Sequence, residues 1–132
     1  MKVTISSTQD DLSYKGVNSK EFVQNFSGTG TACSPMETLL MSAAACSSID
    51  LEILLKKMRQ KVDSVEVEVV GKRREDITPA KFIAIHLTFK LFGEIKDDKA
   101  HKAVEMSLEK MCSVTHSLDQ EIEITTSVEV NP

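Results

Sequence analysis

The sequence predicts an α+β fold in which two helices pack on an antiparallel sheet, with the element order β-β-β-α-β-β-α-β. Two observations carry this prediction. Apolar residues alternate with polar ones over residues 65–69 and again over residues 83–91, as in strands with one buried face. No glycine or proline interrupts residues 36–60, which favours one long helix. We expect a single domain over residues 1–132.

Composition narrows the class of protein. The chain has 132 residues, 41% of them apolar and 27% charged, which is typical of a globular domain and excludes disordered and collagen-like chains. Its formal net charge is −4. Phosphate recognition needs clustered cations, and the chain offers only short basic runs such as residues 72–74, so we expect no nucleic-acid partner.

The cysteines and the N-terminal residues bear on the compartment. The first residues lack the apolar core of a secretory signal, and no run approaches the length of a membrane span, so we expect no membrane association. The cysteines are odd in number and widely spaced: Cys33, Cys46 and Cys112. This pattern favours reduced thiols over a disulfide framework and predicts a cytoplasmic protein.

The first helix has a marked start. Three short strands are expected within residues 3–26, followed by a flexible loop at residues 27–31. Ser34 is the expected N-cap, Pro35 the first helical residue, and Glu37 the partner of Ser34 in a capping box. Glu37 could also be an active-site residue, and both interpretations stay open at this point.

The first half of this helix predicts a partner. Residues 39–49 carry no charge on any face, which indicates burial on all sides. A single sheet and one further helix can cover only part of such an element. The sequence therefore predicts a homodimer that covers the rest.

The second helix opens at Asp97 and Asp98 and carries an apolar stripe at helical spacing until it ends near Ser113. A final strand over residues 122–130 places isoleucines and valines on one face and glutamates on the other.

Two of the thiols could carry chemistry. Cys46 lies among small, uncharged residues in the middle of the first helix, where a thiol is either a small core residue or a placed nucleophile. Cys112 lies in the expected last turn of the second helix, where the helix dipole should raise its pKa; it could serve as a resolving thiol. Cys33, just before the N-cap, is a weaker candidate.

The histidines do not predict a metal or cofactor site. His116 lies four residues after Cys112, a spacing compatible with half a metal site or a thiol–imidazole couple, but two ligands do not make a site. His86 and His101 are expected to contact solvent or a neighbouring carboxylate. Because no phosphate-binding, nucleotide-binding or complete metal-binding motif is present, we expect no cofactor and no metal.

Three segments together resemble the OsmC/Ohr family, named for osmotically induced protein C and the organic hydroperoxide resistance proteins. They are SPMETLLM at residues 34–41, AAACSSID at residues 43–50 and KMCSV at residues 110–114. The resemblance implies an intertwined homodimer around two long central helices. It further implies that Cys46 attacks a hydroperoxide, that Cys112 closes a disulfide, and that an external dithiol reduces it.

The apolar side chains near Cys46 predict the substrate class. Leu39, Leu40, Met41 and Ile49 suggest an apolar pocket, and therefore organic hydroperoxides rather than hydrogen peroxide. A binding protein with an apolar ligand at the dimer interface and no turnover remains the alternative. It is favoured by the lack of any arginine before Arg59 and of any cation among the helical neighbours of Cys46.

Overall fold

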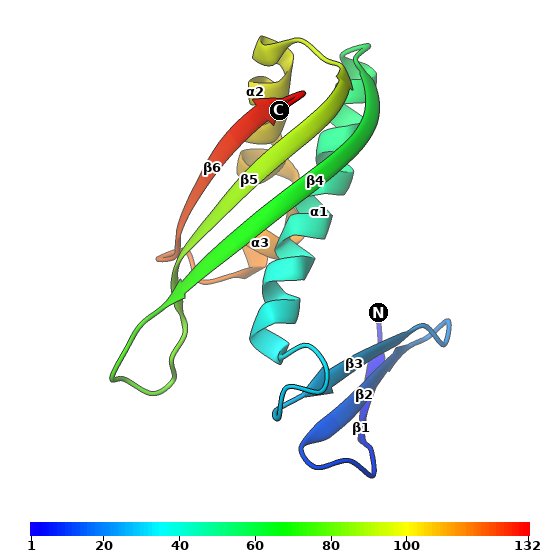
Figure 1. The fold of residues 1–132 in the computed structure, drawn as a ribbon, viewed down its shortest axis with the longest axis vertical. Coiled ribbons are helices and arrows are strands. Elements are labelled where there is room, and N and C mark those ends of the chain that lie inside the picture. The colour runs from blue at the N-terminus through cyan, green and yellow to red at the C-terminus, as the bar shows by residue number, and fades with distance from the viewer. The chain divides into compact units, whose positions relative to one another are not determined.

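The computed structural model describes residues 1–132, and their contacts divide the chain into two compact units, Met1–Leu39 and Leu40–Pro132. The prediction of a single domain stays a prediction. The elements along the chain (Figure 1) are β1 (Val3–Ser7), β2 (Ser13–Asn18), β3 (Val23–Ser27), α1 (Pro35–Lys57), β4 (Lys61–Arg73), β5 (Phe82–Glu94), α2 (Asp97–Met106), η1 (Ser107–Met111), α3 (Ser113–Ser117) and β6 (Glu123–Val130).

The first unit contains the three predicted strands. They form an antiparallel sheet in the order β1-β2-β3. The hydroxyl oxygen of Ser27 accepts hydrogen bonds from the backbone N–H groups of Thr29 and Thr31, which orders the loop after β3. Apolar side chains such as Val3 and Phe22 line a groove of about 350 Å³ on this sheet and are exposed in the single chain. This sheet therefore lacks a cover for its apolar face.

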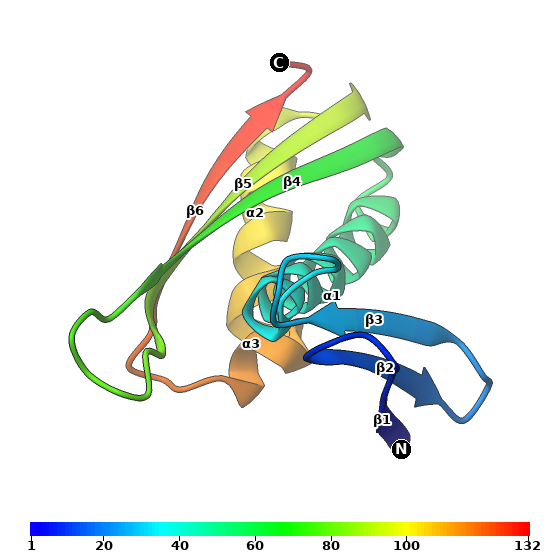
Figure 2. The same ribbon diagram turned by 60° about the horizontal axis from the view of Figure 1, so that its bottom comes forward.

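The second unit holds a separate sheet, in the order β4-β5-β6, so the predicted single sheet is wrong and the strands form two three-stranded sheets. β4 and β5 are antiparallel, as predicted, but β6 runs parallel to β5, so the predicted all-antiparallel arrangement is wrong at this strand. The reason is the connection: the helical segment between β5 and β6 carries the chain back across the sheet, and parallel neighbours require such a crossover. Figures 1 and 2 show α1 and α2 on the same face of this sheet.

The alternation predicted for β4 and β5 is confirmed, with one exception. Leu87, Phe89 and Leu91 are fully buried, but Ile83 is exposed, and Phe82 is buried in its place. The pairing register shifts by one residue between Lys72 and Arg73, so β5 carries an extra residue at Ile83. A β-bulge of this kind reverses the faces of the residues beyond it, which the simple alternation in sequence does not show.

Helix α1 is covered on one face only. Its buried face consists of Ala43, Ser47, Leu51, Leu54 and Leu55, whereas Met41, Ile49 and Ile53 are 51%, 62% and 42% exposed. The single chain thus covers only part of the helix, as the sequence analysis expected, and the predicted cover of the remaining faces by a second copy stays a prediction. The helix ends at Lys57 rather than near Gln60, since Arg59 adopts a left-handed conformation with φ of 58°.

Helix α1 is also long and apolar enough to cross a membrane by length and composition, with a mean hydropathy of 1.5 over its most apolar window. The sequence reasoning expected no such segment. The criterion is weak for one helix, because the core helices of soluble proteins satisfy it as well, and α1 buries Leu51, Leu54 and Leu55 within the second unit.

The second helix is broken where the sequence predicts a continuous one. α2 begins at Asp97, as predicted, but gives way to the π-helical turn η1, and Cys112 then interrupts the helix with an extended ψ of 102° before α3 begins. Cys112 therefore lies in a break rather than in the last turn of a helix. π-Helical turns insert an extra residue into a helix and are frequent at functional sites.

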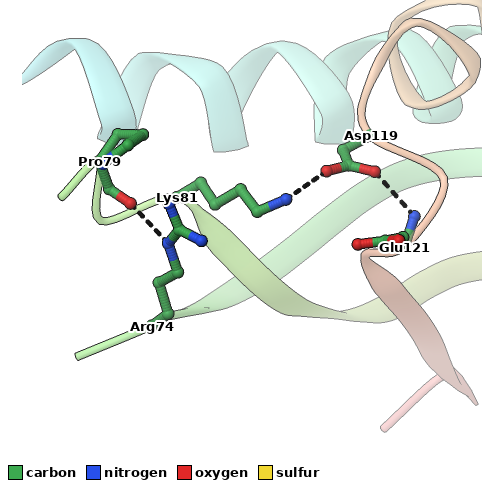
Figure 3. A network of polar contacts seen from close by, with 5 residues as sticks. All are labelled: Arg74, Pro79, Lys81, Asp119 and Glu121. Carbon is green, nitrogen blue, oxygen red and sulfur yellow. Dashed lines mark hydrogen bonds and ion pairs between the residues drawn. The ribbon is translucent and has the colours of Figure 1, made fainter. Parts of the chain in front are cut away.

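A polar network fixes the loop between β4 and β5 (Figure 3). Arg74 Nε donates to the Pro79 carbonyl oxygen at 2.6 Å, and Lys81 Nζ lies 2.6 Å from Asp119 Oδ2. Two hydrogen bonds lower the pKa of the Asp119 carboxyl. The bond from Lys81 has the larger effect, and the bond from the Glu121 N–H has the smaller one. These contacts connect the start of β5 to the segment that leads into β6.

The far end of the β4–β5 hairpin depends on a glycine. Gly93 has a φ of 140°, and a Cβ at this position would collide with the Lys61 carbonyl oxygen and approach the Asp63 nitrogen to 2.9 Å. We predict that Gly93→Ala lowers the free energy of unfolding by about 3 kcal/mol or more. Gly30→Ala is the matched control: its φ is 89° but nothing lies within 4 Å, so strain alone should cost about 1–2 kcal/mol. Urea unfolding measures the free energy of unfolding of both variants. Equal losses in the two variants would contradict the predicted collision at Gly93.

Candidate thiol site

Two cysteines and a carboxylate come together in the second unit. The sulfur atoms of Cys46 and Cys112 and a carboxylate oxygen of Asp50 all lie within 4.8 Å of one another. Cys112 is fully buried, while Cys46 and Asp50 are partly buried. The structure therefore brings together two of the three predicted site residues, Cys46 and Cys112, and adds Asp50.

The helix geometry of α1 places two members of this cluster. Cys46 and Asp50 are four residues apart, and side chains at this spacing lie one above the other on the same helix face. Both side chains lie on the face of α1 next to Cys112, because their sulfur and oxygen atoms are within 4.8 Å of the Cys112 sulfur.

The helix break places the third member. The Cys112 N–H donates to the Ser107 carbonyl oxygen at 2.7 Å, which closes the π-helical turn, and the chain then turns away at Cys112. Its sulfur lies 4.0 Å from the Ala43 carbonyl oxygen on α1. A regular α-helix through Cys112 would direct this side chain differently, so the break sets the direction of the thiol.

Small residues let the two helical segments approach closely. Ser47 and Ser107 are fully buried, and Ser107 Oγ donates to the Ser47 carbonyl oxygen at 2.9 Å. Ser47 Oγ donates in turn to the Ala43 carbonyl oxygen at 2.8 Å. A direct bond from a side chain on one segment to the backbone of the other requires that no bulky residue intervene. The contact between Ser107 and Ser47 holds the turn that ends at Cys112 against α1. The Cys112 sulfur therefore lies near Ala43, about one helical turn before Cys46.

The electrostatics of the cluster distinguish the two thiols. Burial raises the pKa of the Cys112 thiol; Thr115 partly offsets this rise, and the adjacent Cys46 thiol adds to it. The sequence reasoning predicted the same direction from the helix dipole, but burial is the main cause. Cys112 is therefore protonated at neutral pH. Asp50 Oδ2 is buried and has no hydrogen-bond partner.

Glu37, the third predicted site residue, forms the capping box that the sequence predicts. The Ser34 N–H donates to Glu37 Oε1 at 3.0 Å, and the Glu37 N–H donates to Ser34 Oγ at 3.1 Å. The hydrogen bond that the carboxylate accepts from the Ser34 backbone, and after it one with the Ser34 side chain, lower the pKa of the Glu37 carboxyl. Glu37 belongs to the first unit, and its catalytic role stays a prediction.

The remaining candidates make other contacts. His116 Nε2 lies 3.0 Å from the Leu108 carbonyl oxygen. His86 is partly exposed and contacts the hydroxyl groups of Thr125 and Ser127 on β6, and the exposed His101 contacts the Asp97 carbonyl oxygen. Cys33 is a partly buried free thiol of the first unit. The cluster around Cys112 is thus built from Cys46 and Asp50.

Asp50 was not among the site residues predicted from the sequence. The four-residue spacing between Cys46 and Asp50 was a usable signal, because it places both side chains on one helix face. Its importance depends on Cys112, which comes from a distant part of the chain and which only the tertiary structure brings near.

The two thiols should differ in reactivity. We predict that iodoacetamide at neutral pH modifies Cys46 well before Cys112, because Cys112 is 0% exposed and its raised pKa keeps it protonated. Peptide mass mapping over time measures both rates. In Cys46→Ser, Cys112 should stay slow and should react faster as the pH rises. Modification of Cys112 first would contradict this description of the site.

Comparisons with known proteins show which proteins this chain resembles. YhfA of Escherichia coli strain K12 is 44% identical over 100 residues, which cover 75% of this chain and 74% of YhfA. A hypothetical protein from Aquifex aeolicus VF5, known from a crystal structure, is 28% identical with a TM-score of 0.88, covering 98% of this chain and 95% of that one. An organic hydroperoxide resistance protein OsmC from Legionella pneumophila shares the fold at 13% identity and a TM-score of 0.75, covering 98% and 96%.

The family model described as OsmC-like protein matches residues 28–127, a segment that contains α1, β4, β5, the helical elements up to α3 and the three residues of the thiol cluster. This match confirms the resemblance inferred from the sequence motifs. The chain belongs to the OsmC-like protein family.

Proposed function

We propose that the chain is a thiol-dependent hydroperoxide reductase in which Cys46 attacks the peroxide and Cys112 resolves the product. The observation that carries the proposal is the approach of the two thiols to within 4.8 Å inside one chain. A disulfide joins its sulfur atoms at about 2.05 Å, so thiols at this separation need to approach by less than about 3 Å. The Legionella pneumophila protein of the same fold is described as an organic hydroperoxide resistance protein, which supports this choice.

The reaction takes place in three steps. The Cys46 sulfur attacks the terminal oxygen of ROOH, the O–O bond breaks, and ROH leaves with a proton while Cys46 becomes a sulfenic acid. The Cys112 sulfur then displaces the hydroxyl group from the Cys46 sulfur, which forms the disulfide and releases water. An external dithiol reduces the disulfide by thiol–disulfide exchange and is itself oxidised to a disulfide.

The burial of the two thiols supports this order. Cys46 is partly exposed, so a peroxide can reach it, whereas Cys112 is fully buried. The raised pKa of Cys112 further disfavours it as the first nucleophile. Cys112 needs to meet only the sulfur of Cys46, which lies next to it.

The exposed apolar residues on α1 support the choice of substrate and an assembly. Met41, Ile49 and Ile53 form an open stripe along the helix, and the first unit leaves an apolar groove uncovered. We propose that a second copy of the chain covers both surfaces, giving a cytoplasmic homodimer in which an apolar pocket forms beside Cys46. Such a pocket would favour organic hydroperoxides over hydrogen peroxide.

A binding protein is the second candidate. The same apolar surfaces would suit a small apolar ligand, and the chain has no arginine before Arg59 to stabilise a thiolate in the first half of α1. This candidate predicts that peroxide leaves the thiols unchanged.

The decisive test is stoichiometric oxidation. We predict that one equivalent of cumene hydroperoxide added to the reduced protein removes two of the three thiols and lowers the intact mass by about 2 Da, as expected for one disulfide. Cys46→Ser should abolish the reaction. Cys112→Ser should still react once, and its mass should rise by one oxygen atom. Three unchanged thiols in the wild type would favour the binding protein.

Glu37→Gln serves as the informative variant in the same assay. Glutamine can replace glutamate in a capping box, so this change should leave α1 and the thermal unfolding midpoint unaltered while removing the negative charge. If Glu37 is catalytic, which is one of the two interpretations that the sequence left open, the rate of thiol loss should fall by about tenfold or more. An unchanged rate would assign Glu37 to helix capping alone.

A further inference from the structure

We propose that the reduced cluster of Cys46, Asp50 and Cys112 is a binding site for a zinc ion. The two thiols and the carboxylate all lie within 4.8 Å of one another, and they come from two segments that the buried contact between Ser107 and Ser47 holds together. The inference does not depend on peroxide turnover, because it concerns only the reduced state.

The distances suit a tetrahedral ion. Zn²⁺ binds thiolate sulfur at about 2.3 Å and carboxylate oxygen at about 2.0–2.2 Å, so its ligand atoms lie about 3.5–3.8 Å apart. Three groups within 4.8 Å of one another reach this geometry by small side-chain rotations. The spacing of Cys46 and Asp50 is also the i, i+4 pair with which a helix presents two ligands to one ion.

An unpartnered oxygen points to a ligand. Asp50 Oδ2 is buried without a hydrogen-bond partner, and burying a polar atom without a partner is costly. A cation between Asp50 and the two sulfur atoms would satisfy this oxygen. The carboxylate would then be a ligand rather than an isolated charge beside two thiols.

The ligand types select the ion. Two thiolates with one carboxylate favour a borderline or soft cation such as Zn²⁺ over Mg²⁺ or Ca²⁺, which require oxygen ligands. Three protein ligands leave a fourth position for water, on the partly exposed side of the cluster at Cys46. Binding requires both thiols to lose their protons, including Cys112, whose pKa burial raises in the absence of metal.

Cobalt titration of the full-length protein tests the site directly. The reduced, metal-free chain is titrated anaerobically with Co²⁺, which reports thiolate ligation by its charge-transfer absorption, and then with Zn²⁺ as competitor. We expect one equivalent per chain, displaced by Zn²⁺. Cys112→Ser should remove most of the thiolate absorption, and Asp50→Asn should weaken binding by about tenfold or more. Cys33→Ser, the control thiol of the first unit, should bind as the wild type does.

Several results would overturn the proposal: no thiolate absorption at excess Co²⁺, binding that survives in Cys112→Ser, or equal affinity in Asp50→Asn and the wild type. Circular dichroism of each variant shows whether the fold is retained. If a variant unfolds, protection of the wild-type Cys46 from iodoacetamide by stoichiometric Zn²⁺ decides the question, since a bound thiolate alkylates slowly. Metal binding by a protein whose reduced, metal-free form does not react with peroxide would support this site and reject the proposed reductase.

Discussion

The thiol site depends on one close contact between two helical segments of the second unit. Ser107 and Ser47 are both fully buried, and the hydroxyl group of Ser107 donates to the Ser47 backbone at 2.9 Å. Because both side chains are small, the turn that ends at Cys112 lies directly against α1. This contact brings the Cys112 thiol close to Cys46 and Asp50, which lie on either side of Ser47 along α1.

Most of the architecture could be predicted from local sequence signals. The capping box at Ser34, the start of α2 at Asp97 and the alternation in β4 and β5 are short-range patterns, and the structure confirms them. The direction of β6, the bulge at Ile83 and the break at Cys112 depend on how distant segments pack, so no local periodicity encodes them. For the same reason sequence reasoning proposed Cys46 and Cys112 from the family motifs but did not assign Asp50 to their site.

A single chain cannot hold the Cys46–Cys112 disulfide and the zinc ion at the same time. A disulfide between Cys46 and Cys112 consumes both thiolates that would hold a zinc ion, whereas a bound ion withholds the Cys46 sulfur from peroxide. Oxidation would therefore release the ion. In the reduced protein, the bound ion would protect the Cys46 sulfur from peroxide. The exposed apolar stripe of α1 borders this site, so covering it would also control which molecules reach Cys46.

The most direct test of the central claim is to widen the small-residue contact and follow closure of the disulfide. With the thiol oxidant diamide, peptide mapping of the wild type should reveal a Cys46–Cys112 bond within one chain. Ser107→Val inserts bulk at the contact and should slow its formation by about tenfold or more, because a shift of about 1 Å strongly reduces such proximity-dependent reactions. Ser117→Val, at an exposed serine of α3, is the matched control and should close at the wild-type rate. A wild-type chain that pairs Cys33 instead, or equal rates in all three proteins, would contradict the account.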